Sequence, residues 1–592
     1  MNEDTITEYD DLGRPVEIDR SDWQDQLLPQ LLEEAWDNAD ELYEHIVRGV
    51  EQGFAPSLVE AAQRLTRIDN DAERCAVTDA VVLMHANDLE GAEEALQSFV
   101  ARHGRSAIVL SNLARVRYEK GDVAGAERLL REALDLDPNQ NNGLDWWGAL
   151  CSEIGGPEAY LGGLREIAAL PGAWRPQIWI AQQLLCDGEI EEALDLYREI
   201  LPAAAACGDA LMQITGDLGN AGLLPEMLDL TLPVYEPTQH GPYAGLNMAR
   251  GLLELDRIDE ARTLLDTLQG LQAPQLTETL NQLELDIADA AGGPAPLDEE
   301  PTLVMVRGPV WLQEHAEHLL PRLSPASERI VFLSLNDATR DPEVEQLEPI
   351  TPFGRFARAL PLYLAERLRI TTDADARTVV PIARGAGPIL PGLPWDVEWV
   401  VDQIDPAERP DVLVHGGLEP TEDGNQLVLR LFDPNEGKEL RAIILPLTDD
   451  HASHVPEIEA AVLEALESTG RLRPRRPRRG FTIPAGDAQA AYLLMTSFLF
   501  AQLLVANDLI PRSVLTNERS ILTGYFRLVE CLPEAVPARL LAIRGVLAAN
   551  RYSSPVAVHF LRPLLGVIDE QSDKLGDFLP DVRALLDEQG AG

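Results

Sequence analysis

The chain has 592 residues, of which 45% are hydrophobic and 25% are charged, so two or three folded domains are expected and a mainly disordered protein is excluded. Its 48 basic and 99 acidic residues give a net charge of −51, which disfavours nucleic acid and anionic membranes as partners. The acidic surface serves solubility or attracts basic partners.

Residues 1–36 are predicted to form an acidic N-terminal arm, loose at first and then helical. Trp23 and the leucines at 27, 28, 31 and 32 form an apolar stripe that could dock on the next segment. No apolar run follows Met1, so no secretory signal is expected. The five cysteines are scattered without a Cys-x-x-Cys pair, which indicates reduced thiols and a cytoplasmic protein.

A period of about 34 residues runs from Ala39 to Pro274. It is visible in the turn residue expected between paired helices, and the only irregular interval follows a shorter Gly-Gly-Pro turn. The predicted turn residues are Gly53, Asn87, Gly121, Gly155, Gly188, Gly222 and Asp256. Seven helix pairs are therefore expected, with residues 275–290 as a solvated cap helix and 37–291 as the whole solenoid.

The segment 107–140 is the clearest unit. Two amphipathic runs, 108–120 and 124–135, are separated by Gly121-Asp122 and closed by Pro138, which cannot continue a helix. The unit resembles a tetratricopeptide (TPR) repeat of bacterial type, including the run Asn112-Leu113-Ala114 and the proline stop. The resemblance implies a superhelix whose first helices line a concave groove that binds a protein or peptide without catalysis.

The groove residues expected to contact this partner are Asn112, Arg115, Tyr118, Trp146 and Trp179. One TPR subclass grips a terminal carboxylate with Lys, Arg and Asn at set first-helix positions. The same positions here carry Ile108, Ser111, Asn112 and Arg115, so that clamp is not matched and a chaperone tail is not the expected ligand.

Tryptophans are concentrated in two neighbouring first helices, and they have two interpretations. They fill gaps between helices, or they anchor a ligand in the groove. The tryptophans concerned are Trp146, Trp147, Trp174 and Trp179.

After a linker at 291–301, residues 302–470 are predicted to form an α+β domain. Strands are expected at 302–306, 329–335, 411–418, 426–432 and 439–445, and helices at 311–320, 356–368, 396–404 and 456–468. The segments 412–418, 427–433 and 437–440 resemble the amino-terminal domain of TolB and its FlgO-like relatives, which implies an assembly or docking module. Because no secretory signal is expected in this chain, the resemblance does not imply a periplasmic role.

Residues 471–484 are an Arg/Pro-rich linker, and 485–592 are predicted as a helical C-terminal domain. The run 471–480 holds six arginines, and either rests on the acidic body or binds an anionic ligand. Residues 488–506 are uncharged and long enough to span a bilayer, so a buried core helix and a membrane helix are both open. Further helices are expected at 520–531, 535–549, 555–569 and 578–589.

Catalytic signatures are weak. Two histidine pairs, His315/His318 and His451/His454, could each supply half of a metal site, but no spacing nominates a third ligand. The glycine-rich stretch 384–388 lacks the end of a phosphate loop. No catalytic residue, metal or cofactor is therefore predicted.

The sequence favours a multidomain, non-catalytic scaffold or adaptor: an all-α TPR-like superhelix, an α+β domain and an all-α C-terminal domain. The groove is expected to bind a protein or peptide, and the later domains a second partner or a second copy of the chain. A membrane-anchored assembly factor and an enzyme or metal-binding protein remain as alternatives.

Overall fold

The computed structural model describes residues 5–9, 14–271, 273–290, 301–312, 314–324, 327–340, 351–422, 424–448, 450–481, 484, 487–570 and 572–590. The chain divides into two compact units, Met1–Gln275 and Leu276–Gly592. The predicted linker at 291–301 lies outside the described residues except for Pro301.

The first unit opens with a small hairpin where a loose arm was predicted. Within the described residues the arm comprises β1 (Thr5–Tyr9), antiparallel β2 (Pro15–Asp19), α1 (Arg20–Asp22), a π-helical turn (Trp23–Leu27) and α2 (Leu28–Glu34). The hairpin was not predicted because the prediction relied on the acidic composition of residues 1–36 and not on contacts between buried side chains. Trp23 is fully buried and stacks on Phe54 with ring centroids 5.3 Å apart, so the apolar stripe does dock on the first repeat.

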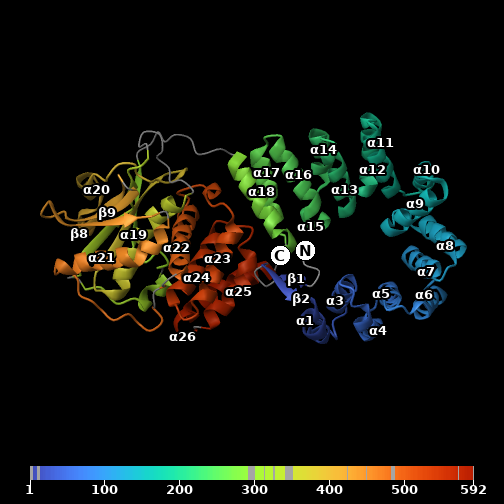
Figure 1. Cartoon of the computed structure of the whole chain (residues 1–592), viewed down its shortest axis with the longest axis horizontal. Coiled ribbons are helices and arrows are strands. Elements are labelled where there is room, and N and C mark those ends of the chain that lie inside the picture. Colours follow the sequence, from blue (N-terminus) through green and yellow to red (C-terminus); the bar gives the residue numbers. More distant parts are fainter. Residues whose placement is uncertain are drawn as a thin grey trace. The chain divides into compact units, whose positions relative to one another are not determined.

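Seven helix pairs follow within residues 39–269, as the 34-residue period predicts (Figure 1). The pairs are α3 (Ala39–Glu51) and α4 (Val59–Ile68); α5 (Ala72–His85) and α6 (Leu89–His103); α7 (Ala107–Glu119) and α8 (Val123–Leu136); α9 (Asn141–Gly155) and α10 (Pro157–Ala168); α11 (Arg175–Asp187) and α12 (Ile190–Ala204); α13 (Gly208–Asn220) and α14 (Leu224–Thr231); α16 (Pro242–Glu254) and α17 (Ile258–Gln269). The short α15 (Pro237–His240) precedes the last pair.

Six of the seven predicted turn residues have the left-handed backbone that ends a first helix, with φ between 58° and 85°. The exception is the fourth unit, where α9 includes Gly155 and the positive φ of 79° belongs to Gly156. Pro157 then begins α10 at once, because a proline is well placed in the first turn of a helix. The turn is therefore one residue later than predicted.

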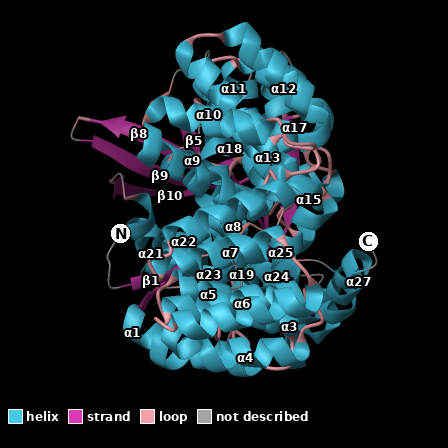
Figure 2. Cartoon of the chain, turned by 90° about the vertical axis from the view of Figure 1, so that its right-hand side faces the viewer, coloured by secondary structure: helices cyan, strands magenta, loops and turns pink. Residues whose placement is uncertain are grey.

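The second unit combines a mixed sheet with the C-terminal helices, and among the described residues the other strands are those of the N-terminal hairpin (Figure 2). The strands are β3 (Thr302–Arg307), β4 (Arg329–Leu333), β5 (Asn336–Asp337), β6 (Asp375–Ala383), β7 (Gly387–Pro388), β8 (Val412–Thr421), β9 (Gly424–Asp433) and β10 (Lys438–Leu447). The main order is β10-β9-β8-β4-β6-β3; β4 runs parallel to β6 and β8, and the outer pairings are antiparallel.

The described part of the second unit also contains ten helices, and only some of them pack against the sheet. The helices are α18 (Thr277–Ala290), α19 (Pro352–Thr371), α20 (Val397–Gln403), α21 (Val455–Ser468), α22 (Asp487–Ala506), α23 (Glu518–Cys531), α24 (Val536–Arg551), α25 (Val558–Asp569), α26 (Ser572–Leu575) and α27 (Leu579–Gly590). One face packs on α20 through Val331, Val400 and Leu413, while α19 contacts β4 and β6.

Two expectations for this unit need correction. The helix predicted at 311–320 is only a 3₁₀ turn at Glu314–Leu319, and the long strand β6, which pairs with β3, β4 and β7, was not predicted. In addition α18, expected as the solenoid cap, belongs to the second unit, where Glu284 Oε1 accepts a hydrogen bond of 2.8 Å from the Asn517 amide.

The apolar helix α22 meets the length and composition of a membrane span over Ala488–Ala506, but 67% of that window is buried. Its polar side chains are also buried and bonded to neighbours. Tyr492 donates to Glu366 at 2.6 Å, and Ser497 accepts from Arg358 at 2.6 Å. Such bonds suit the core helix of a folded unit, because each polar group has a protein partner there.

Candidate functional site

The candidate site is the row of side chains that the repeats place at equivalent positions on successive first helices. Several first helices contact the first helix of the next repeat, as α11 contacts α13 and α13 contacts α16. Equivalent positions therefore follow one another from repeat to repeat on one face. We call the set Asn112, Trp146, Trp179, Gln213 and Asn247 the groove row; its members are 34, 33, 34 and 34 residues apart.

Direct contacts join members of the row to neighbouring repeats. Trp179 Nε1 donates to Gln213 Oε1 at 3.3 Å, across 34 residues of sequence. Asn247 Nδ2 donates to Thr215 Oγ1 at 3.1 Å. Asn112 Nδ2 instead donates to the Ile108 carbonyl of its own helix at 2.9 Å. The row is thus held by the packing of first helix on first helix.

The aromatic side chains in and beside the groove row are partly exposed. Tyr118 is 39% exposed and meets Trp146 edge to face, with ring centroids 5.6 Å apart and an interplanar angle of 89°. Trp146 and Trp179 are half-buried against the core of α7–α10, whereas Trp147 is 9% exposed. Trp147 is therefore a packing residue, and Trp146 and Trp179 combine packing with an accessible surface.

Arg115 lies one turn from Asn112 on α7 and is exposed. Among the residues that the structure describes, its guanidinium has no hydrogen bond or ion pair. The structure thus brings Tyr118 and Trp146 into contact, and leaves Arg115 as a cation available to a ligand.

Sequence reasoning missed Gln213 and Asn247. Both fall at the phase of Trp179, so the 34-residue register could have identified them from the sequence. A buried carboxyl lies beside them: Asp217 accepts from Gln182 at 2.6 Å and from Tyr197 at 2.9 Å. Burial raises the pKa of Asp217 above its usual range, against these two hydrogen bonds.

The described side chains of the two histidine pairs have other surroundings than a metal site. The ring of His451 packs against Phe353 at 5.2 Å, while His454 Nε2 lies 2.9 Å from Thr448 Oγ1. His318 is exposed, and its carbonyl accepts from Arg478. Within the described part of the chain, no group of three His, Cys, Asp or Glu side chains could hold a metal ion.

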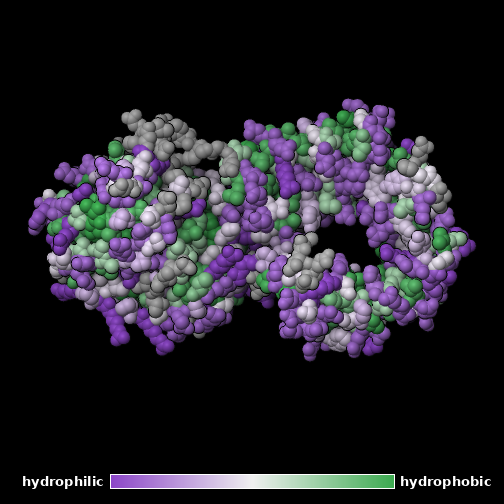
Figure 3. Space-filling view, in the orientation of Figure 1, coloured by the Kyte–Doolittle hydropathy of each residue, from purple (hydrophilic) through white to green (hydrophobic). Residues whose placement is uncertain are grey.

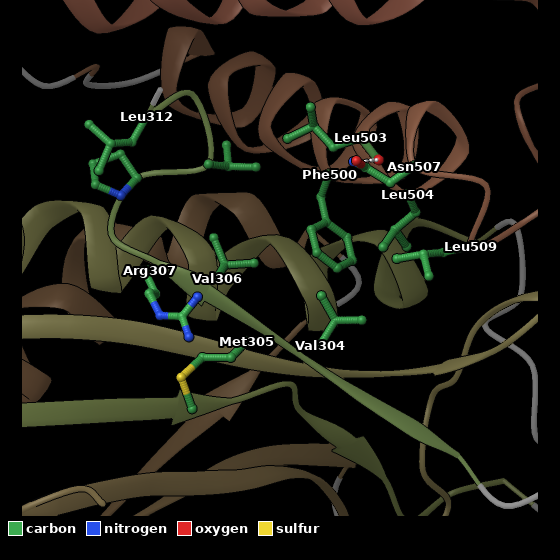
Figure 4. Close-up of a pocket in the computed structure, with 12 residues that line it drawn as sticks. Val304, Met305, Val306, Arg307, Leu312, Phe500, Leu503, Leu504, Asn507 and Leu509 are labelled. Atoms are coloured by element: carbon green, nitrogen blue, oxygen red, sulfur yellow. Dashed lines mark hydrogen bonds between the residues drawn. The ribbon is translucent and has the colours of Figure 1, made fainter. Parts of the chain in front are cut away.

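A cavity of about 300 Å³ lies beside the edge strand β3 in the second unit. Figure 4 shows Val304 and Val306 of the strand on one side, and Phe500, Leu503 and Leu504 of α22 on the other. Nucleophilic and acidic groups do not line it, so the cavity offers no chemistry of its own.

A family model described as a tetratricopeptide repeat matches residues 107–132 and 242–267. These segments fall in the pairs α7/α8 and α16/α17, which confirms tetratricopeptide repeats at two of the seven predicted units. No curated protein sequence matches the chain significantly.

Solved structures of similar helical repeats have low identity to this chain. A tetratricopeptide repeat protein from Parabacteroides merdae is 14% identical, covers 42% of this chain and 98% of its own, and has a TM-score of 0.23. Yeast Tom70 is 13% identical over 46% of this chain and 58% of its own, with a TM-score of 0.29. The TPR2AB domain of yeast Sti1 in complex with an HSP90 peptide is 13% identical over 42% and 98%, with a TM-score of 0.18.

At these scores the solved structures carry no argument about partner or mechanism. The repeat assignment rests on the family model and on the helix pairs themselves. Repeats of this kind typically mediate protein–protein interactions, and proteins built from them are generally non-catalytic. The first unit of this chain is therefore a stack that contains tetratricopeptide repeats.

Proposed function

We propose that the chain is a non-catalytic, cytoplasmic scaffold whose first unit binds an extended segment of a protein partner along the groove row. The observation that carries the proposal is the row itself, in which the adjacent rings of Trp146 and Trp179 are flanked by amide side chains on neighbouring first helices. A curved stack places such a row along a continuous surface, and Figure 3 shows the first unit hollowed inside its arc.

The chemistry of the row suits an extended peptide. An amide side chain carries both donors and acceptors, and the bonds made by Asn112, Gln213 and Asn247 use only part of that capacity. It can therefore pair with the N–H and C=O groups of a peptide backbone. Trp146 and Trp179 offer rigid apolar surface at low entropic cost, as aromatic anchors of interfaces do.

We further propose that the second unit docks a second partner or a second copy of the chain. The meander β8–β10 is the part that resembles the TolB and FlgO-like module, and its edge strand β10 carries Ile444 with 60% of its surface exposed. An exposed apolar side chain on an edge strand supports a docking role.

Affinity capture from a native lysate, with the full chain as bait, tests the groove. Arg115→Glu reverses a charge beside the row, and Arg128→Glu makes the same change on the second helix α8, where Arg128 is also exposed. The proposal expects a captured protein that is lost with Arg115→Glu and retained with Arg128→Glu. Equal capture by both variants would reject the groove as the binding surface.

A further inference from the structure

The arginine-rich run, which we call the arginine strap (Arg471–Gly480), is anchored to the second unit by its backbone. The Arg475 amide donates to the Thr371 carbonyl at 2.6 Å, and the Asp373 amide donates to the Arg473 carbonyl at 3.2 Å. At the other end the Val536 amide donates to the Gly480 carbonyl at 2.8 Å. The strap therefore lies across the folded unit in a defined path.

Among the residues that the structure describes, most of its guanidinium groups make no ion pair with a carboxylate. Arg471 is the exception, because it pairs with Asp433, which is 2% exposed. Arg475 and Arg478 donate to the backbone carbonyls of Arg322 and His318, which carry no net charge. Within the described residues, the exposed side chains of Arg476 and Arg479 make no hydrogen bond or ion pair.

Further cations and a few acids surround the strap. Burial lowers the pKa of Arg369, and the nearby charge of Arg475 acts in the same direction, against the carboxylate of Asp375. Arg369 Nη1 is buried without an acceptor among the described atoms. Asp373 accepts a hydrogen bond of 3.2 Å from the backbone amide of Arg473. Acids gather at the Arg471 end of the strap, where Asp433, Glu328 and Asp411 act on its guanidinium. Unpaired positive charge within the described residues therefore lies toward the other end, at Arg476 and Arg479, in a chain of net charge −51.

We infer that the arginine strap is a docking surface for an acidic segment of a protein partner. Guanidinium groups bind carboxylates in a bidentate geometry, so a row of arginines matches a row of Asp or Glu side chains. Pro474 and Pro477 fix the backbone φ angle, so little conformational freedom is lost when the segment binds.

Charge complementarity at short range selects a peptide segment over a long polyanion. At physiological salt the Debye length is about 8 Å, so a short segment on the strap is shielded from most of the acidic surface. A nucleic acid would extend past the strap onto that surface and be repelled. This surface lies in the second unit and is independent of the groove row.

The test measures binding of a labelled oligoglutamate peptide to the full chain by fluorescence anisotropy. Arg476→Ser/Arg479→Ser removes two arginines that make no bond within the described chain, so folding should be retained, and circular dichroism verifies it. The matched control is Arg527→Ser/Arg562→Ser, which removes two exposed arginines from α23 and α25 of the same unit.

The strap variant should weaken peptide binding about fivefold while the control leaves it unchanged, since each exposed ion pair contributes modestly. Raising the salt concentration should weaken binding to the wild-type chain. The inference is overturned if the peptide does not bind, if both variants lose binding equally, or if a single-stranded RNA of matched charge binds more tightly than the peptide.

Discussion

The two units of this chain differ in how far apart in the sequence their contacting residues lie. In the first unit the polar contacts join neighbouring repeats, as Arg74 pairs with Asp40 and Trp179 with Gln213, each 34 residues apart. In the second unit Arg358 bonds Ser497 across 139 residues, and Tyr492 bonds Glu366 across 126. A repeat needs only its neighbour, whereas the second unit needs its whole length to complete its core.

The largest expected effect that separates the two units comes from Gly416 in β8. A Cβ there would lie 1.9 Å from the Val428 carbonyl oxygen, and φ is 141°, so Gly416→Ala should destabilise the second unit by about 3 kcal/mol or more. Gly424 has a similar φ of 146° but open space around it, so Gly424→Ala should cost only about 1 kcal/mol.

Thermal unfolding of the full chain measures this difference. The unfolding temperature of the second unit should fall strongly in Gly416→Ala and weakly in Gly424→Ala. The unfolding temperature of the solenoid should stay the same in both variants. Equal shifts for the two glycines would contradict the packing described for β8 and β9.

The next expected effect comes from Glu366, whose carboxyl group is buried between α19 and α22 of the second unit. Burial raises the pKa of Glu366 from 4.5 to about 7. The folded state then holds the proton more tightly than the unfolded chain, so its contribution to stability is complete below pH 4.5 and is lost as the pH rises through 7. Between about pH 5 and about pH 8 this loss is about 2 kcal/mol.

Glu366→Gln should remove that loss, so the free energy of unfolding of the variant should fall less between these pH values than that of the wild-type chain. Denaturant titrations at both of these pH values measure the free energy of unfolding of the variant and of the wild-type chain. Burial lowers the pKa of His415 to about 4, which changes stability in the opposite direction but equally in both proteins. An unchanged pH dependence in the variant would show that Glu366 does not titrate in this range.

The smallest expected effects lie in the solenoid, where single positions act locally. Gly121 has φ of 85° with nothing within 4 Å of a new Cβ, so Gly121→Ala should cost about 1 kcal/mol through backbone strain. Gly162 lies exposed in α10 with equally open space, and Gly162→Ala should stabilise the helix by about 0.5 to 1 kcal/mol. Urea denaturation of each variant checks that the two substitutions have opposite signs.

The same contrast explains what the sequence could predict. The turn residues repeat, so the register of the helix pairs was readable, and the single slip at Gly155 arose where a proline follows directly. The strand β6 was missed because it is buried on both faces and contains Arg377 and Pro381, so it shows no alternation. The pairing of α19 with α22 was not predictable, because no local pattern links Glu366 to Tyr492.

The candidate site divides in the same way. Asn112, Trp146 and Trp179 share one phase of the repeat register with Gln213 and Asn247, and their role in binding stays a prediction. The free charge of the arginine strap could not be read from sequence, since it depends on which arginines find a carboxylate in the folded unit. Arg471 finds Asp433, while Arg476 and Arg479 find no partner among the described residues.

The most direct test of the groove is site-specific photocrosslinking in cells of the native host. A benzoylphenylalanine replaces Arg115 on the first helix α7 in one protein and Arg128 on the second helix α8 in another; both positions are exposed in the same repeat. The account predicts a discrete crosslinked protein from position 115 and none from position 128. Crosslinks from position 128 alone, or equal crosslinks from both, would contradict binding along the groove row.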